Sequence, residues 1–363
     1  MSAAPCARPL IVRCGAFGDM VLITAMVREL SARFRSPVDI LTSGPWSEPL
    51  LAGQPGVGEI LTVRSRKTPY WLAADQRRAV RRLRERGAGP IWFCDAPDAA
   101  RSMLRRAGIA ERFIVDVKDH PLQDAEHATE QWRRLAAIMP AALADGAPPP
   151  HGGADSPGAQ HPRESGCFLE VRADQRADLD RWLNARNLDA LALILVQMGN
   201  KRTMRRGLRR LAVNHKYWPL DRWAALLDHL RRDRPRHHIL LLGTGPEYRL
   251  NQEVAALAGN DRLHNVADDL PVPRLIALLA RADALISVDS GPAHAAAAVG
   301  CPQIVLFGKA LPSLYRPWGA SGGQVIVLTG RVNGAPDMLG IETASVIEAW
   351  AALRRGGAAA DVR

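Results

Sequence analysis

A short apolar run with a β-branched centre, 284–288, is followed at once by residues that can bind a charged ligand. These residues are Asp289, Ser290, Gly291 and His294. Pro292 suits the first turn of a helix and Gly300 suits its end, so the sequence predicts a strand, a tight turn and an alanine-rich helix. The amides after Ser290 and Gly291 would then lie at the positive end of the helix, where a phosphate can be bound without a metal.

Asp289 and His294 suit different parts of such a ligand. A carboxylate repels phosphate, so Asp289 suits sugar hydroxyls, whereas His294 can donate to a phosphate or to a hydroxyl. The simpler alternative is that Asp289 and Ser290 are helix caps and that His294 is an ordinary helix residue. The combination with Gly291 and a proline at this spacing favours a binding site.

Lys216 lies in the segment Lys-Tyr-Trp-Pro, immediately before an amphipathic helix pattern. A cation and a helix dipole that point at one place can stabilise a departing diphosphate when no divalent metal is present. The preceding segment, 200–213, is long and very basic, so Lys201 is an alternative to Lys216 in this role.

Glu247 follows a strand pattern at 238–242 in the segment Gly-Thr-Gly-Pro-Glu. A carboxylate at this place can accept hydrogen bonds from both hydroxyls of a ribose. The alternative is that Glu247 only occupies a first helical turn, where the helix dipole favours an acidic residue.

Asp19 closes the pattern Gly15-x-x-Gly18-Asp19, directly after the first strand pattern. This is not G-x-G-x-x-G, and no acidic residue closes the next strand, so a dinucleotide fingerprint is absent. The two glycines allow this carboxylate-bearing turn to approach a ligand closely. As a lone residue, Asp19 could also serve only as an N-cap.

A basic loop follows the third strand pattern and contains Arg64, Arg66 and Lys67, with Tyr70 and Trp71 close behind. Cations beside aromatic rings suit an anionic, partly apolar acceptor molecule. A solvated loop without function is an equal alternative.

Strand patterns alternate with helix patterns along both halves of the chain. The strand patterns lie near 10–14, 38–42, 59–63, 90–94 and 112–115 in the first half, and begin near 191, 238, 263, 284 and 303 in the second. The alternation predicts an α/β protein with two parallel, doubly wound sheets that bind ligands beyond the carboxyl ends of their strands. In the usual strand order the first and fourth strands of the second half are neighbours. The turns of Lys216 and Asp289 would then flank one crevice.

A segment rich in proline and glycine divides the chain. We therefore expect an acceptor-binding Rossmann-like domain at 1–140, a linker at 141–166 and a nucleotide-sugar-binding Rossmann-like domain at 167–342. The last segment, 343–363, is expected to hold a helix that crosses back to the first domain, and a tail.

The composition indicates a globular protein of about two domains, with 363 residues of which 47% are hydrophobic. No apolar run approaches the roughly 18 residues that span a membrane, and no signal peptide precedes the first strand, so we expect a cytoplasmic protein. The five cysteines form no C-x-x-C pair, which argues against a zinc site or a disulfide framework. The net charge of +11 points to an anionic partner.

The pattern Asp289-Ser290-Gly291-x-x-His294, closed by Gly300-x-Pro302, resembles the C-terminal signature of glycosyltransferase family 9. These enzymes are the ADP-heptose:lipopolysaccharide heptosyltransferases. The likeness recurs at Gly15-x-x-Gly18-Asp19, at Lys216-x-Trp-Pro and at the turn 316–319, and covers roughly residues 10–350.

The resemblance implies a GT-B fold, in which two doubly wound domains face each other across a cleft. It implies inverting, metal-independent transfer of heptose from ADP-heptose to an inner-core lipopolysaccharide acceptor, with Asp19 as the general base. Lys216, the Ser290 and Gly291 amides and His294 would hold the leaving diphosphate. Asp289 would position the sugar and Glu247 the ribose, and Gly18 would border the donor. Arg64, Arg66 and Lys67 would contact the acceptor.

The expected partners are an ADP-sugar and an anionic glycolipid, with peripheral contact at the cytoplasmic face of the inner membrane and no metal, cofactor or nucleic acid. One alternative is a family 9 transferase that acts on a protein, capsule or O-antigen acceptor with another nucleotide sugar. A second is a non-catalytic protein that binds nucleotide sugars or RNA. The missing G-x-G-x-x-G pattern argues against a third, a dehydrogenase.

Overall fold

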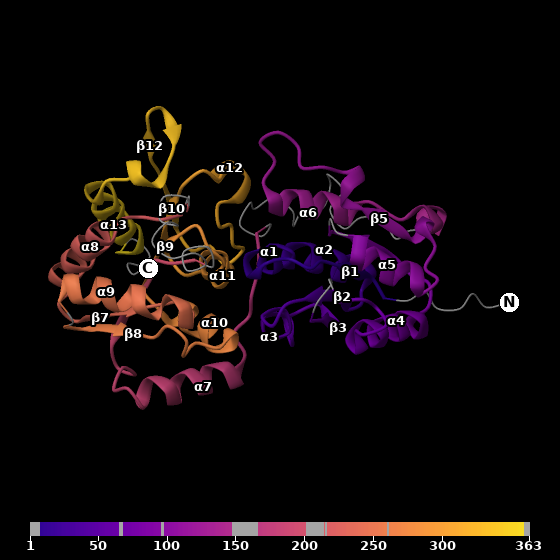
Figure 1. Cartoon of the computed structure of the whole chain (residues 1–363), viewed down its shortest axis with the longest axis horizontal. Coiled ribbons are helices and arrows are strands. Elements are labelled where there is room, and N and C mark those ends of the chain that lie inside the picture. Colours follow the sequence, from indigo (N-terminus) through magenta and orange to yellow (C-terminus); the bar gives the residue numbers. More distant parts are fainter. Residues whose placement is uncertain are drawn as a thin grey trace. The chain divides into compact units, whose positions relative to one another are not determined.

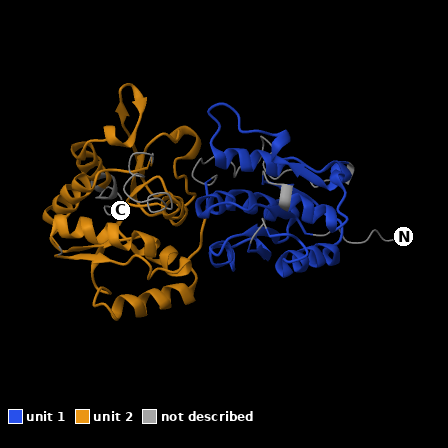
Figure 2. Ribbon diagram, in the orientation of Figure 1, with its two compact units in different colours: residues 1–167 blue, residues 168–363 orange. Residues whose placement is uncertain are grey.

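The computed structural model (Figure 1) describes residues 8–64, 68–95, 98–146, 166–200, 214, 216–259 and 261–358. The chain divides into two compact units, unit 1 at residues 1–167 and unit 2 at residues 168–363 (Figure 2). Arg66, Lys67, the alternative cation Lys201 and most of the predicted linker lie outside the described residues. Within those residues, no helix combines the length and the apolar character needed to cross a bilayer.

Unit 1 is built on a parallel five-stranded sheet in the order β3-β2-β1-β4-β5. Its strands are β1 (Leu10–Val12), β2 (Val38–Ser43), β3 (Val57–Val63), β4 (Ile91–Phe93) and β5 (Ile114–Asp116). Its α-helices are α1 (Phe17–Leu22), α2 (Thr24–Phe34), α3 (Ser47–Leu51), α4 (Ala74–Arg86), α5 (Asp98–Arg106) and α6 (Ala128–Ala137). The central strands are short apolar runs buried on both faces, as expected of a parallel sheet covered by helices.

The helix pattern after the first strand is divided into two helices. The hydroxyl of Thr24 donates to the carbonyl oxygen of Val21 at 2.7 Å, and the division falls between these residues at Ile23. A threonine that bonds back to the preceding turn in this way bends a helix. The short first helix, α1, therefore carries Asp19 at the carboxyl end of β1, separately from the longer α2.

Unit 2 is built on a parallel six-stranded sheet in the order β11-β10-β9-β6-β7-β8. Its strands are β6 (Ala192–Gln197), β7 (His237–Leu241), β8 (Leu263–Asn265), β9 (Ala284–Val288), β10 (Gln303–Phe307) and β11 (Val325–Thr329), and β12 (Arg331–Val332) pairs separately with β13 (Ala335–Pro336). Its α-helices are α7 (Ala173–Asn184), α8 (Leu220–Asp233), α9 (Tyr248–Ala258), α10 (Val272–Arg281), α11 (Gly291–Val299), α12 (Pro312–Tyr315) and α13 (Thr343–Ala358).

The strand order of unit 2 confirms that the first and fourth strands of the sheet are neighbours. β6 pairs with β9 in parallel, with Gln197 opposite Ser287. The core around these strands includes Trp218 and Trp223, whose rings meet edge to face at a centroid distance of 4.8 Å. Helix α13 packs within this unit, against α8, β10 and β11.

Candidate functional site

The carboxyl ends of β6 and β9 form the centre of the candidate site in unit 2. The strand order reverses between these two strands, since β7 and β8 continue the sheet on one side and β10 and β11 on the other. Ligands of doubly wound sheets bind at such a reversal point, beyond the carboxyl ends of the strands. Gln197 ends β6, and Asp289 directly follows β9.

Lys216 and Asp289 meet at this edge of the sheet. The Lys216 Nζ lies 2.6 Å from Asp289 Oδ2 and donates to the Asp289 carbonyl oxygen at 2.8 Å. The Asp289 side chain is 9% exposed and that of Lys216 is 30% exposed, so the ammonium remains accessible from solvent. The two sequence motifs that were expected to flank one crevice are therefore in direct contact.

The position of Lys216 relative to its own helix differs from the sequence interpretation. Helix α8 begins at Leu220 with Pro219 as its N-cap, so Lys216 does not stand immediately before it. A proline disfavours the helical conformation in the residue before it, which stops the helix from extending back through Trp218. The ammonium instead lies beside the turn that leads into α11.

Helix α11 begins at Gly291, with Ser290 at the N-cap position. The Ser290 side chain makes no capping hydrogen bond, and its buried hydroxyl has no hydrogen-bond partner among the described residues. The capping role that was the simpler interpretation of Ser290 is therefore not fulfilled by its hydroxyl. His294 lies one turn into the helix and is buried, with 7% of its surface exposed.

Glu247 ends a 3₁₀ helix, Gly245–Glu247, after β7 and is buried, with 4% of its surface exposed. Its Oε2 accepts from the backbone N–H and from the hydroxyl of Thr244, both at 2.8 Å, and its Oε1 accepts from Gln197 Nε2 at 3.2 Å. Burial raises the pKa of Glu247, and the hydrogen bonds from Thr244 and Gln197 partly offset this. Gly199 is required here because a Cβ at this position would overlap Glu247 Oε1.

Sequence reasoning missed three members of this cluster, namely Gln197, Gly199 and Thr244. The signal that could have identified Gln197 is a polar residue at the end of an otherwise apolar strand run. Its side chain links the end of β6 to the Glu247 carboxylate. Gln197 is also the register partner of Ser287 on β9, so the cluster lies at the same edge of the sheet as the Lys216–Asp289 pair.

Asp19 is the third residue of α1 in unit 1. The N–H of Ala16 donates to Asp19 Oδ2 at 2.8 Å, so Asp19 reaches back to the start of the helix rather than capping it as the first residue. Its other oxygen lies 3.3 Å from Arg13 Nη2, and 39% of its side chain is exposed. A Cβ at Gly15 would overlap the Asp19 side chain, and Gly18 directly precedes Asp19 in the helix.

Arg13 is a further residue of this cluster that the sequence did not single out. It donates from Nη1 to the Cys94 carbonyl oxygen at 2.6 Å, and its guanidinium carbon lies 5.2 Å from the centroid of the Trp132 ring. These contacts hold the cation beside Asp19 at the carboxyl edge of the unit 1 sheet.

The expected acceptor loop is described in part. Arg64 is exposed, and its backbone N–H donates to Asp75 Oδ2 at 2.6 Å. Trp71 is 73% exposed on the turn that precedes α4. Arg66 and Lys67 lie outside the described residues.

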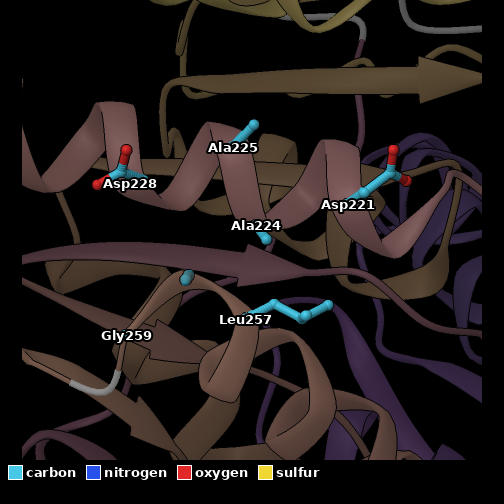
Figure 3. A pocket seen from close by; sticks show the side chains of 7 residues that line it. Asp221, Ala224, Ala225, Asp228, Leu257 and Gly259 are labelled. Atoms are coloured by element: carbon cyan, nitrogen blue, oxygen red, sulfur yellow. The ribbon is translucent and has the colours of Figure 1, made fainter.

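Unit 2 also carries a surface groove between α8 and the end of α9 (Figure 3). It is lined by Asp221, Ala224, Ala225, Asp228, Leu257, Ala258 and Gly259. None of the site residues expected from the sequence lines this groove, and we assign it no role.

The two Rossmann-like units define the GT-B fold class, and solved structures share this fold over almost the whole chain. The structure of a family 9 glycosyltransferase from Veillonella parvula gives a TM-score of 0.73 at 18% identity, covering 96% of this chain and 97% of that one. The structure of ADP-heptose lipopolysaccharide heptosyltransferase II from Escherichia coli gives 0.70 at 20% identity, covering 95% and 98%.

The match to a family profile lies in unit 2. Residues 207–334 match the sequence profile of glycosyltransferase family 9 (heptosyltransferase). Lipopolysaccharide heptosyltransferase 3 of Escherichia coli is 34% identical over 106 residues, which are 28% of this chain and 30% of that protein. Lipopolysaccharide heptosyltransferase 2 of Salmonella typhimurium is 25% identical over 118 residues, which are 32% of this chain and 33% of that protein. The matched region thus spans about a third of the length of these curated relatives. Residues 207–334 are therefore similar to glycosyltransferase family 9, and the whole chain shares the fold of the solved structures above.

Proposed function

We propose that this protein is an inverting, metal-independent glycosyltransferase that moves heptose from ADP-heptose to an inner-core lipopolysaccharide acceptor. The contact between Lys216 and Asp289 beside the start of α11 carries this proposal. The family profile and the names of the relatives support it, as do solved neighbours of lower identity, whose descriptions include ADP and ADP-2-deoxy-2-fluoro heptose.

The departing diphosphate is held in unit 2. A lysine ammonium has three N–H donors, and two of those of Lys216 are directed at the carboxylate and the carbonyl of Asp289. The third is available for a phosphate oxygen, together with the Ser290 hydroxyl and the amide of Gly291 at the positive end of α11. His294 donates to the same group. The negative charge that develops on the leaving oxygen is thereby stabilised without a metal.

Two carboxylates of unit 2 bind the neutral parts of the donor. Asp289 accepts from sugar hydroxyls while Lys216 compensates its charge. Glu247 accepts from a ribose hydroxyl at Oε1, which has one acceptor site left beside the hydrogen bond from Gln197. The contacts with Thr244 and Gln197 fix the orientation of the carboxylate before the donor binds.

Asp19 is the general base. It takes the proton of the acceptor hydroxyl as that oxygen attacks the anomeric carbon and the bond from this carbon to the diphosphate oxygen breaks, with the electron pair leaving on ADP. Attack from the side opposite the leaving group inverts the anomeric centre. Gly18 leaves room for the donor beside Asp19, and Arg64, Arg66 and Lys67 contact the anionic acceptor. The enzyme works in the cytoplasm, in peripheral contact with the inner membrane.

The donor is tested first. ADP-, GDP- and UDP-sugars are compared for protection against thermal unfolding, because a bound ligand stabilises the native state by mass action. ADP-heptose is expected to protect most. Protection by a different nucleotide sugar alone would favour a family 9 transferase with another donor, and protection by none would contradict the proposal.

The chemistry is tested with Asp19→Asn. Removing the base is expected to lower kcat by roughly 10²- to 10⁴-fold while the affinity for ADP stays within about twofold. Asp174→Asn is a matched control, because Asp174 is also a first-turn carboxylate bonded to an arginine, Arg172. Full turnover in Asp19→Asn would refute the assigned base, and a wild-type protein that binds ADP-heptose without turning it over would favour a non-catalytic binding protein.

A further inference from the structure

Trp71 and Leu72 are two consecutive apolar side chains that face solvent, with 73% and 59% of their surface exposed. They lie on a turn fixed by backbone hydrogen bonds, since the N–H groups of Leu72 and Ala73 donate to the carbonyl oxygen of Pro69 at 2.9 and 3.1 Å. Arg77 also donates from its guanidinium to the carbonyl oxygens of Tyr70 and Trp71. The exposure of Trp71 and Leu72 therefore belongs to an ordered turn.

Four arginines lie near this turn, on α4 and at the end of α5, and contacts link three of them to it. Arg77 bonds to the turn itself, and the guanidinium of Arg106, at the end of α5, lies 4.4 Å from the centroid of the Tyr70 ring. Arg84 donates to the carbonyl oxygen of Arg106 at 2.7 Å. Arg81 lies one helical turn from both Arg77 and Arg84 on α4, on the same side of the helix.

The charge of these four arginines is largely uncompensated by neighbouring acids. Within the described residues, Arg81 alone among them has a carboxylate within 4.0 Å, Glu85 at 3.9 Å. The other acidic residue of α4, Asp75, accepts from the backbone of Arg64 and Gln76. We name this set, consisting of Trp71, Leu72, Arg77, Arg81, Arg84 and Arg106, the Trp71 surface.

We propose that the Trp71 surface docks this protein onto an anionic lipid bilayer. Tryptophan concentrates at the interface between lipid and water, and an adjacent leucine can enter the acyl region. Arginines beside them are attracted by the negative potential of anionic headgroups. The choice of a bilayer as partner rests on the proposed function, whose acceptor is a membrane glycolipid.

Single-stranded nucleic acid is the competing partner, because arginine and aromatic side chains also bind stacked bases. Two observations favour the bilayer. Leu72 has no planar face on which a base could stack, and the Tyr70 ring is already covered by Arg106. An apolar pair next to cations is the pattern expected of an interfacial anchor.

Vesicle co-sedimentation of the full chain tests the proposal. The protein is expected to bind vesicles of phosphatidylcholine mixed with phosphatidylglycerol, to bind pure phosphatidylcholine at least tenfold more weakly, and to be released by salt, since exposed charges are screened. The double variant Trp71→Ser, Leu72→Ser is expected to lose at least about tenfold in partitioning. Arg81→Gln is expected to lower partitioning onto these vesicles about fivefold, which is the effect of removing one cation near an anionic membrane surface.

Matched controls lie on the other unit. Leu257 is 64% exposed, and Arg181 has a 73% exposed side chain with a carboxylate at 3.7 Å, much as Arg81 has. Leu257→Ser and Arg181→Gln are expected to bind vesicles like the wild type. Brominated lipids provide a second readout, because they should quench the fluorescence of Trp71 in the wild type. The quenched part of the tryptophan emission should be missing in Trp71→Phe.

Equal binding to both kinds of vesicle, or wild-type binding by the Trp71→Ser, Leu72→Ser variant, would overturn the proposal. So would binding to a short RNA that weakens with Arg81→Gln, combined with no binding to vesicles. The measurement needs no turnover. A protein that binds vesicles but is protected by no nucleotide sugar would refute the proposed function and leave this surface assigned.

Discussion

The ion pair between Lys216 and Asp289 couples binding to stability at a single residue. Lys216→Met is expected to weaken ADP binding roughly tenfold to a hundredfold, the value of one hydrogen bond to a charged group. It also leaves the buried Asp289 carboxylate uncompensated, which should cost about 1–2 kcal/mol of unfolding free energy because Lys216 is partly exposed. Titration calorimetry and urea denaturation measure the two effects.

Lys118 provides the control for Lys216. It is also a lysine beside a buried carboxylate, since its Nζ lies 3.4 Å from Asp116 Oδ2, and Arg101 pairs with the same carboxylate. Lys118→Met is therefore expected to lose less stability than Lys216→Met and to keep its ADP affinity. If both variants kept wild-type ADP binding, Lys216 would have only a structural role.

Glu247 gives the pH dependence of the site. Because burial raises the pKa of the folded carboxyl above its unfolded value, its contribution to stability is complete below about pH 4 and is lost as the pH rises through the folded pKa. The unfolding free energy of Glu247→Gln relative to wild type is therefore expected to increase with pH across this window and then to level off. Urea denaturation across a pH series measures it, with Glu253→Gln at an exposed position on α9 as the control substitution.

Ribose binding has the opposite requirement, since only the ionised Glu247 carboxylate keeps an acceptor site on Oε1 for a ribose hydroxyl beside its hydrogen bonds from Thr244 and Gln197. The ratio of ADP affinities, wild type to Glu247→Gln, should therefore fall as the pH is lowered through the same window. Taking the ratio cancels the titration of ADP itself. A ratio that stays constant with pH would show that Glu247 does not contact the ribose.

Residues of the site could be predicted from the sequence only where they belong to a recognisable sequence motif. Lys216 and Asp289 were expected to lie close together because each belongs to a motif near the end of a strand, and the usual strand order makes these two strands neighbours. Gln197 and Thr244 were missed because their contacts with Glu247 join side chains from separate elements. Arg13 was missed for the same reason, since its partners include Cys94 and Trp132.

Secondary-structure elements were predicted well where apolar periodicity decided them and less well at their ends. The five strands predicted in unit 2 are present, because apolar runs bounded by turn residues leave little freedom, whereas the sixth strand, β11, was not predicted. Residues 69–86 have a helical pattern in the sequence, but their first residues form the turn that exposes Trp71, and α4 starts at Ala74. The start of α4 depends on the hydrogen bonds to the carbonyl oxygen of Pro69, and the spacing of apolar residues in the sequence does not reveal these bonds.

Helix α11 depends on a close approach of the segment after α12. A Cβ at Gly319 would overlap the carbonyl of Ala297 in α11, so Gly319→Ala must displace backbone. We expect a loss of about 1–3 kcal/mol, as for overpacked cores, measured by urea denaturation. Gly245→Ala is the control, because the new Cβ would lie 3.5 Å from the Cβ of Asp268, which is an ordinary van der Waals contact. Equal stability of the two variants would mean that the 316–319 turn does not support α11.

At the scale of the whole molecule, each unit has its own parallel sheet and its own apolar core. The alternation of strands and helices was sufficient to predict this duplication. Residue chemistry alone placed a phosphate in the second half, at Lys216 and the Ser290–Gly291 turn, whereas the role of Asp19 as the general base came only from the family resemblance.

Hydrogen exchange in the presence of ADP separates the roles of the two units. A ligand at 100 times its dissociation constant stabilises the state that binds it by about 2.7 kcal/mol, so amides at the site should exchange more slowly. We expect the strongest protection in unit 2, in the segments after β6, β7 and β9 and in the first turn of α11. The β1–α1 turn of unit 1, which carries Asp19, should change little, because ADP alone brings no acceptor hydroxyl for this carboxylate to deprotonate. At the same ADP concentration, Lys216→Met should reduce the stabilisation to about 0.4–1.4 kcal/mol, whereas Lys118→Met should retain it. Protection of the β1–α1 turn with none around α11 would assign nucleotide binding to unit 1 and would exchange the roles of the two units.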